Sequence, residues 1–395
     1  MTTRAKVLLL SPEVGLTEAD TASAGSNVHL AATLEGLKSS FEVLPLLADA
    51  EPAATVRSAP ARTLRRFVPG WLSGLRQDLR AIGADRRFGA AAIAAGRPFA
   101  PDVVYARSEY FSFSSVRVAR ALQAPLVLEV NGLLSNDVKA IYRSPLEPAG
   151  RVLEKRKHRR AAAIVTVSPG LARLLEASGV DPGKIFVVPN SISPDRITAQ
   201  ERAATGSRIV VGWVGHLMPW HFEAIELLLE CAPEVVRRVP PLEFLVIGGG
   251  PGLETLEERA RELGLAGRFR FTGAVSHAEI PARLAEVDIA VIPAVFEYAF
   301  PVKIVEFGAA GLAVVAPRSP SLDEQIEPHL DYEPFTPDDR ADLVATLVRL
   351  AEDPARRQEL GDALRRKVAA EFTWTATGVL LADLIGGLLV LDAPG

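Results

Sequence analysis

The chain has 395 residues, of which 48% are hydrophobic and 23% charged, and its net charge is −4. This length exceeds what a single hydrophobic core supports, so two domains are expected, and the composition excludes a disordered or fibrous protein. The negative net charge predicts no nucleic-acid partner, and the single cysteine, Cys231, excludes an intramolecular disulfide and favours a reducing, cytoplasmic compartment.

The first half of the chain predicts strands that are buried on both faces. The apolar runs are continuous rather than alternating, which is typical of a parallel sheet covered by helices. Helical patterns at 28–37 and 171–178 supply the crossovers that parallel strands require. A doubly wound α/β domain is therefore expected over residues 1–195. Its predicted strands are Val7–Leu10, Val103–Tyr105, Leu126–Val130, Ala163–Val167 and Phe186–Val188.

The same rhythm repeats after a polar stretch, which predicts a linker at 196–207 and a second α/β domain over 208–375. Two facing parallel sheets would leave a cleft at the carboxyl ends of their strands, where ligands of such sheets bind. The predicted strands of the second domain are Ile209–Val214, Phe244–Ile247, Phe269–Phe271, Ile289–Pro293 and Ala313–Ala316.

Neither apolar end of the chain predicts a membrane span. The run Val7–Leu10 is too short for a signal peptide or a transmembrane helix. The tail at 379–391 is also short and contains Asp383, so we expect residues 376–395 to form a helix that packs back toward the N-terminal domain.

A locally basic segment lies between Arg57 and Arg97, with nine arginines against two aspartates. Leucines and an isoleucine recur within it at helical spacing, and arginines fall largely between them. The more common interpretation is a packed helix with a solvated basic face. The alternative is peripheral contact of segment 57–97 with an anionic membrane at its inner, cytoplasmic face.

Seven short motifs occur in the order and at the spacing of one family, over most of the chain. Together they resemble the retaining glycosyltransferases of family 4, whose GT-B architecture consists of two facing Rossmann-like domains. The motifs are the glycine loop 24–29, Tyr105-Ala-Arg107, Val167-Ser-Pro-Gly170, Val188-Pro-Asn190-Ser191, the segment 211–221, Leu245-Val-Ile-Gly248-Gly-Gly250-Pro and the segment 298–311.

The sequence departs from the family pattern at three places. His216 and His221 stand where relatives commonly carry Arg and Lys in the phosphate loop. Tyr298 replaces the first of two glutamates, and Glu306 is the second, a combination found in one branch of the family. Glu129-Val-Asn131 stands where many relatives place a histidine.

The segment Pro301-Val302-Lys303-Ile-Val-Glu306 predicts a binding site for a nucleotide diphosphate. Proline is tolerated in the first turn of a helix, so Lys303 and the first-turn amides would face one phosphate together. Glu306 lies three residues on, on the same helical face, and the resemblance implies that it accepts both ribose hydroxyls. A solvated surface lysine and an ordinary surface ion pair are the alternatives.

Leaving-group stabilisation in metal-dependent transferases usually involves an Asp-x-Asp pair, and the chain contains none. We therefore expect no metal and no cofactor, with the nucleotide diphosphate sugar as co-substrate and protein cations and amides in the place of a metal. Gly215, with His216 or His221, would approach the diphosphate, and Gly25 and Asn27 would meet it from the opposite wall. Gly248–Gly250 is expected to be a tight strand-to-loop turn.

The family resemblance implies transfer of a sugar with retention of configuration, in which the leaving diphosphate assists attack on the same face. The implied donor-binding set also includes Tyr298, Pro301 and Val302. Lys303 and His29 are the implied catalytic residues, and His29 could equally be a buried structural histidine. Arg107, Glu129 and Asn131 lie on the side of the acceptor, which would be a glycan, a lipid-linked sugar or a small molecule. A GT-B epimerase and a non-catalytic nucleotide-binding relative are the alternatives.

Overall fold

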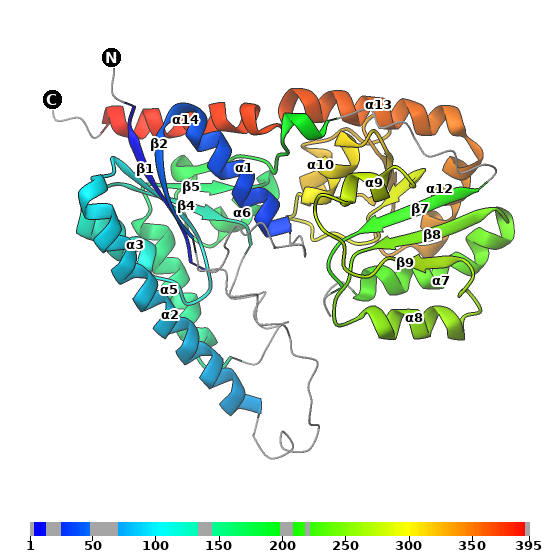
Figure 1. Ribbon diagram of the computed structural model, residues 1–395, viewed down its shortest axis with the longest axis horizontal. Coiled ribbons are helices and arrows are strands. Elements are labelled where there is room, and N and C mark those ends of the chain that lie inside the picture. Colours follow the sequence, from blue (N-terminus) through cyan, green and yellow to red (C-terminus); the bar gives the residue numbers. More distant parts are fainter. Residues whose placement is uncertain are drawn as a thin grey trace. The chain divides into compact units, whose positions relative to one another are not determined.

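The computed structural model describes residues 4–12, 25–47, 70–132, 144–197, 208–217 and 222–391 (Figure 1). The chain divides into two compact units, one built mainly from 33–189 with the first strand and the helix after Thr377, the other mainly from 190–376. The first unit thus ends a little before the boundary predicted at 195, and the domain boundaries themselves stay predictions.

The first unit contains a six-stranded parallel sheet with the strand order β2-β1-β3-β4-β5-β6. Its central strands are almost completely buried, as their continuous apolar runs predict. The strands are β1 (Lys6–Ser11), β2 (Glu42–Leu47), β3 (Val103–Arg107), β4 (Leu126–Val130), β5 (Ala163–Thr166) and β6 (Ile185–Val187).

Helices connect these strands and pack on one another. Asp85 of α2 accepts hydrogen bonds from the backbone amides of Phe113 and Ser114 at the start of α3. A residue of another helix thus caps the N-terminus of α3. The final helix, α14, approaches α1 closely: a Cβ atom on Gly378 would lie 2.9 Å from the Gly36 carbonyl oxygen. The helices are α1 (Gly25–Ser40), α2 (Gly70–Phe99), α3 (Ser114–Leu122), α5 (Glu147–Arg160), α6 (Pro169–Ala177) and α14 (Trp374–Leu391), with a short turn η2 (Pro182–Lys184).

The second unit repeats the architecture, with a parallel sheet of order β12-β11-β10-β7-β8-β9. One face is covered by α7, α8 and α12, and the other by α9, α10 and α13, so each face has its own apolar core. The strands are β7 (Ile209–Val214), β8 (Leu242–Ile247), β9 (Phe269–Phe271), β10 (Ile289–Val291), β11 (Ala313–Pro317) and β12 (Glu333–Phe335).

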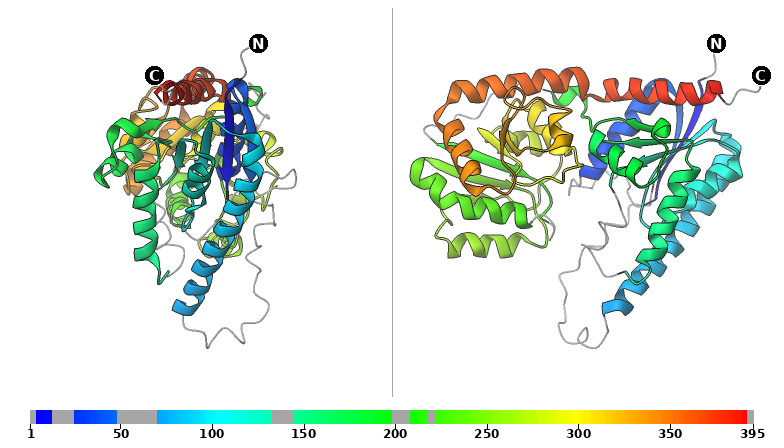
Figure 2. Two further views of the ribbon diagram at one scale, coloured as in Figure 1. Left: turned by 90° about the vertical axis from the view of Figure 1, so that its left-hand side faces the viewer. Right: turned by 180° about the vertical axis from the view of Figure 1, so that it is seen from behind.

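The helices of the second unit complete a doubly wound α/β arrangement, and two such six-stranded parallel sheets confirm the predicted fold class. Figure 2 shows the helical layers of each unit from two further sides. The elements are η3 (Pro194–Arg196), α7 (Phe222–Arg238), α8 (Leu253–Glu262), α9 (Ile280–Leu284), α10 (Val302–Ala309), α11 (Pro320–Asp323), α12 (Arg340–Glu352) and α13 (Pro354–Glu371).

Two strands, β2 and β12, were not predicted from the sequence. Each contains a proline, Pro45 in β2 and Pro334 in β12, and each lies at the edge of its sheet. Proline cannot donate a ladder hydrogen bond, but an edge strand has one side on which no donor is needed. Each proline argues against a strand when only the sequence is considered, but it is compatible with a strand at the edge of a sheet.

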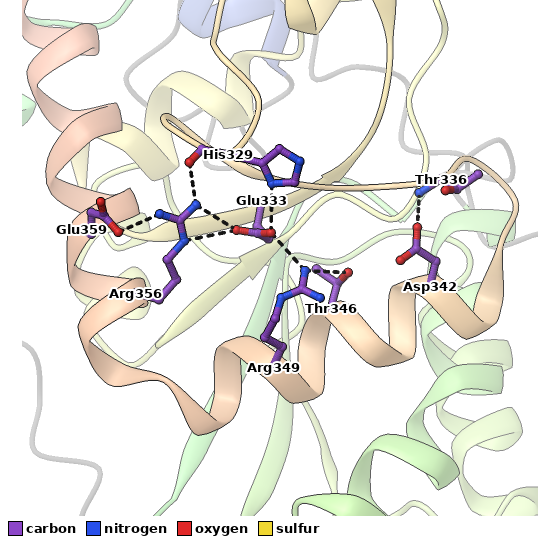
Figure 3. A network of polar contacts seen from close by, with 8 residues as sticks. All are labelled: His329, Glu333, Thr336, Asp342, Thr346, Arg349, Arg356 and Glu359. Carbon is purple, nitrogen blue, oxygen red and sulfur yellow. Dashed lines mark hydrogen bonds and ion pairs between the residues drawn. The ribbon is translucent and has the colours of Figure 1, made fainter.

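A buried carboxylate joins β12 to the two helices that follow it (Figure 3). Glu333, only 4% exposed, accepts hydrogen bonds from Arg349 of α12 at 3.0 Å and from Arg356 of α13 at 3.2 Å, and His329 Nδ1 lies 3.2 Å from it. The two guanidinium groups compensate the cost of burying this charge. The network attaches the short edge strand to the helical layer, which is a structural role.

The apolar tail forms α14, whose Leu381, Leu384 and Ile385 are buried. In the part of the chain that the structure describes, no helix combines the length and the apolar character needed to cross a membrane.

Candidate functional site

The loops at the carboxyl edge of the second sheet carry the predicted phosphate-binding residues. After β7, the chain continues through Gly215 and His216, and it is bonded to the loop after β8. Gly215 N donates to Ile247 O at 3.0 Å, and Leu217 N donates to Gly249 O at 2.9 Å. The two loops therefore form one continuous backbone layer at the edge where ligands of parallel sheets bind.

Glycines allow this close packing. Gly248 has φ of 127°, and a Cβ atom there would lie 2.0 Å from the Gly215 carbonyl oxygen. At Gly250, with φ of 152°, a Cβ atom would lie 2.8 Å from the His216 ring. Only glycine fits both positions without displacing a neighbour. The expected tight turn at 248–250 is confirmed, and it supports His216, which is half-buried.

Helix α10 begins where the sequence predicts. Pro301 is its N-cap residue, Val302 its first residue, and Lys303 lies in the first turn. The start of the helix is fixed by Asn190, a buried residue of the Val188-Pro-Asn190-Ser191 motif, whose side-chain amide donates to the Phe300 carbonyl oxygen. Because first-turn amides lack carbonyl partners within their own helix, this end of α10 attracts anions.

The ammonium of Lys303 lies over the indole ring of Trp213, 4.4 Å from the ring centroid. Burial lowers the pKa of Lys303 to about 8, while the nearby carboxylate of Glu306 opposes this shift. The indole face stabilises the cation without neutralising it. Lys303 thus remains mostly charged at neutral pH and does not behave as a solvated surface lysine.

Glu306 lies one turn further along α10 and is not a simple surface residue. Its side chain is only 12% exposed, and Oε1 lies 3.3 Å from Nε2 of His277. The guanidinium of Arg196 contacts the same imidazole, 3.0 Å from Nδ1 and 2.6 Å from Nε2. Arg196, His277 and Glu306 therefore form a polar chain beside α10.

The loop between β10 and α10 presents a pair of aromatic rings. Phe296 and Tyr298 stack with centroids 5.5 Å apart and planes 7° from parallel, and Phe296 is 61% exposed. Ser319 at the start of α11 donates to the Glu297 carbonyl oxygen at 3.1 Å, which braces the loop. Tyr298, which the family resemblance matches to a glutamate, is thus one ring of an aromatic pair.

In the first unit, Glu129 and Asn131 lie together at the carboxyl end of β4. Glu129 is 2% exposed and accepts hydrogen bonds from Asn131 at 2.6 Å, from Tyr105 at 2.9 Å and from Thr33 at 3.4 Å. Burial, reinforced by the charge of Glu129, raises the pKa of the Tyr105 hydroxyl well above its usual value. Three polar side chains, from α1, from β3 and from the residue after β4, thus converge on one carboxylate.

Arg107, at the end of β3, pairs with Glu109 at 3.1 Å. The buried Lys157 of α5 donates to the Glu109 carbonyl oxygen at 2.9 Å. Burial raises the pKa of the Glu109 carboxyl, while Arg107 and Lys157 oppose that shift. The predicted acceptor-side residues therefore lie within a larger polar region at the carboxyl ends of β3 and β4.

The remaining predicted residues are on or near α1 and the phosphate loop. Gly25 is the first residue of α1, Asn27 lies in its first turn, and His29 is buried on the same helix. His221 lies outside the described residues.

Three residues of the second unit carry no role in the sequence analysis: Trp213, His277 and Arg196. Trp213 is the next-to-last residue of the buried strand β7, so its place in the sequence suggests a core residue. No spacing in the sequence links it to Lys303. His277 and Arg196 are distant from Glu306 in sequence and meet it only through the fold.

Both units match family models. Residues 24–191 match the model described as "Glycosyl transferase 4-like domain", and residues 208–353 match "Glycosyl transferases group 1". The D-inositol 3-phosphate glycosyltransferase of Corynebacterium efficiens is 30% identical over 293 residues, which cover 69% of this chain and 68% of that protein. The chain belongs to the group 1 glycosyltransferases.

Another relative of this group 1 glycosyltransferase is the GDP-mannose-dependent alpha-(1-6)-phosphatidylinositol monomannoside mannosyltransferase of Mycolicibacterium smegmatis, which is 31% identical over 218 residues. The matched region covers 53% of this chain and 55% of that relative, so the chain spans about half the length of this curated relative. Both relatives are named as transferases, which favours a transferase over the epimerase alternative.

Solved structures agree on the fold. Sucrose-phosphate synthase from Thermosynechococcus elongatus superposes with a TM-score of 0.74 at 18% identity, over 98% of this chain and all of that one. Anabaena Alr3699/HepE in complex with UDP and glucose gives a TM-score of 0.70 at 16% identity, over 97% of this chain and all of that one. The GT-B fold expected from the sequence is thereby confirmed.

The low pKa of Lys303 predicts that binding of a nucleoside diphosphate weakens in alkaline solution. The phosphates are fully ionised above pH 7, whereas Lys303 loses its proton as pH rises through about 8. We expect the Kd for UDP or GDP, whichever binds more tightly, to rise about tenfold between pH 7 and pH 9.5. Calorimetry across this range measures the effect.

The variant Lys303→Arg is the control, since a guanidinium keeps its charge throughout this range. Its affinity should vary little with pH. A wild-type affinity that is constant from pH 7 to pH 9.5 would show that Lys303 does not contact the phosphates.

Proposed function

We propose that the chain transfers a sugar from a nucleoside diphosphate sugar to a hydroxyl-bearing acceptor, with retention of configuration and without a metal ion. The observation that carries the proposal is the pairing of Lys303, held on Trp213 in the first turn of α10, with Glu306 one turn further on. A rise of about 1.5 Å per residue separates these positions by about 4.5 Å along the helix, which suits adjacent phosphate and ribose groups.

The leaving diphosphate would be stabilised by Lys303 and by the first-turn amides of α10. Gly215 and His216 lie on the neighbouring loop and would add close backbone approach and an imidazole hydrogen bond. The proposal of metal independence rests on the missing Asp-x-Asp pair and on this cation. Among the described residues, no three His, Cys, Asp or Glu side chains gather as metal ligands.

Retention would follow from attack on the face that the diphosphate leaves. The acceptor oxygen forms a bond to the anomeric carbon as the carbon–phosphate oxygen bond breaks, and the hydroxyl proton passes to the departing phosphate oxygen. No protein nucleophile is needed in this route, which agrees with the resemblance of the sequence to the retaining enzymes of family 4. Lys303 would stabilise the departing charge, and His29 remains the second predicted catalytic residue.

The acceptor would bind through the polar region of the first unit. Glu129, Asn131 and Arg107 lie at the carboxyl ends of neighbouring strands and offer both acceptors and donors for hydroxyl groups. The acceptors named for the relatives above contain inositol. They support an acceptor of the glycan, lipid-linked or small-molecule classes for this chain.

Donor binding tests the proposal first. Lys303→Ala and Glu306→Ala should each raise the Kd for a nucleoside diphosphate by about tenfold or more, because each removes a charge-assisted contact. The matched control is the Lys367–Glu371 pair of α13, whose atoms lie 3.2 Å apart in the same unit. Lys367→Ala and Glu371→Ala should bind like the wild type.

Turnover is tested with a panel of donors and acceptors in the presence of EDTA, and the anomeric configuration of the product is read by NMR. Transfer that survives EDTA and retains the configuration supports the proposal. Inversion or loss of transfer on chelation would contradict it, and tight donor binding without transfer to any acceptor would favour a non-catalytic nucleotide-binding protein.

Contact with an anionic membrane is a further part of the proposal. Helix α2 exposes Arg76, Arg80 and Arg87, and between them Leu79 is 57% exposed. Figure 1 shows α2 extending well beyond the sheet of its own unit. An exposed leucine among arginines is typical of a surface that meets anionic lipid.

Sedimentation with vesicles tests this surface. The protein should bind vesicles that contain phosphatidylglycerol, and it should not bind pure phosphatidylcholine. The triple variant R76E, R80E, R87E should lose binding, while reversal of Arg237, Arg238 and Arg259, exposed on α7 and α8, should preserve it. Equal loss in both triple variants would mean that only net charge matters.

A further inference from the structure

The side chain assigned to the ribose, Glu306, is held by a second residue in the second unit. Nε2 of His277 lies 3.3 Å from Oε1 of Glu306, and both side chains are more than half buried. A cavity of about 20 Å³ beside the carboxylate is lined by Arg196 and otherwise by apolar residues such as Ile192, Ile280 and Ala309. That space holds one water at most, and His277 contacts the carboxylate directly.

The position of His277 is itself fixed by its loop. His277 follows β9 and precedes α9, and the loop is closed by Glu279, which accepts hydrogen bonds from the amide of Ser276 at 2.8 Å and from its hydroxyl at 2.6 Å. The backbone on either side of the histidine is therefore ordered before any ligand arrives.

Arg196 contacts both ring nitrogens of His277. One guanidinium nitrogen lies 2.6 Å from Nε2 and 3.0 Å from Nδ1, and Arg196 also donates to the His277 carbonyl oxygen at 3.2 Å. These contacts hold the ring and its backbone carbonyl in place beside Glu306.

Arg196 is anchored in the same unit. It ends the short helix η3, and the chain just before it is bonded to the segment after α13: Ile192 N donates to Phe372 O at 2.9 Å, and Trp374 N donates to Ile192 O at 3.0 Å. Burial lowers the pKa of Arg196, while the charge of Glu306 raises it, so the two opposite charges attract each other.

We infer that His277 is a positioning residue for nucleotide recognition: its imidazole, held by Arg196, hydrogen-bonds Glu306 and fixes the carboxylate for the ribose hydroxyls. The inference rests on the proposed function, because it assumes that Glu306 meets the ribose. Its consequence is specific. Loss of His277 impairs discrimination between ribose and deoxyribose rather than binding of the phosphates.

The test compares the Kd of UDP or GDP, whichever the wild type prefers, with that of its 2′-deoxy counterpart. The wild type should favour the ribonucleotide by about tenfold, the effect of one charge-assisted hydrogen bond. In His277→Phe this ratio should fall to about twofold or less, with the deoxynucleotide Kd changed by less than about twofold. His277→Gln, which keeps an N–H donor, should recover part of the ratio, and Arg196→Met should lower it.

His329→Phe is the matched control, since His329 of the same unit lies 3.2 Å from the carboxylate of another glutamate, Glu333 (Figure 3). It should leave the ratio unchanged. If His277→Phe weakens both nucleotides equally, or leaves the ratio as in the wild type, the positioning role is wrong although the donor site stands. If the wild type binds neither UDP nor GDP, the proposed function itself fails.

Discussion

The contact between the Lys303 ammonium and the Trp213 indole is the interaction on which the proposed donor site depends. A cation that is to meet a diphosphate must be out of bulk water and yet remain charged. The indole presents an electron-rich face that attracts the ammonium but carries no net charge. A carboxylate in the same place would attract the ammonium as well, but it would neutralise the lysine. Glu306 contributes a further attraction from one turn away, so the lysine keeps its proton at neutral pH in spite of its burial.

This arrangement requires α10 to begin at a fixed residue. The short segment 190–196 holds the helix at two points. Asn190 binds the Phe300 carbonyl oxygen just before the helix starts, and Arg196 reaches Glu306 through His277 one turn later. The segment 190–196 therefore orders both ends of the proposed donor site, the one assigned to the phosphates and the one assigned to the ribose. The glycines at 248 and 250 do the same for the neighbouring phosphate loop, since any larger residue would push it away from the sheet edge.

Much of the fold can be predicted from the sequence, because strands buried on both faces appear as continuous apolar runs. All ten expected strands are present, and the two that were missed, β2 and β12, are edge strands that contain a proline. Propensity argues against strands at Pro45 and Pro334, and only the position at the edge of a sheet makes them acceptable.

The site is predictable where its residues are close in sequence. Pro301, Lys303 and Glu306 occupy one helix turn, so their relation follows from helical periodicity. Trp213, His277 and Arg196 meet α10 only through tertiary packing: the first appears in the sequence as a core residue and the others as isolated polar residues. The hydrogen bonds of Glu129 cannot be predicted from sequence spacing either, because its three donors come from α1, β3 and the end of its own strand.

A crystal structure with bound UDP or GDP would test the central claim most directly. The account predicts the diphosphate within hydrogen-bond distance of Lys303 and the first-turn amides of α10, with both ribose hydroxyls on Glu306. A nucleotide bound elsewhere, for example at the carboxyl ends of β3 and β4, with the first turn of α10 free of phosphate, would contradict it.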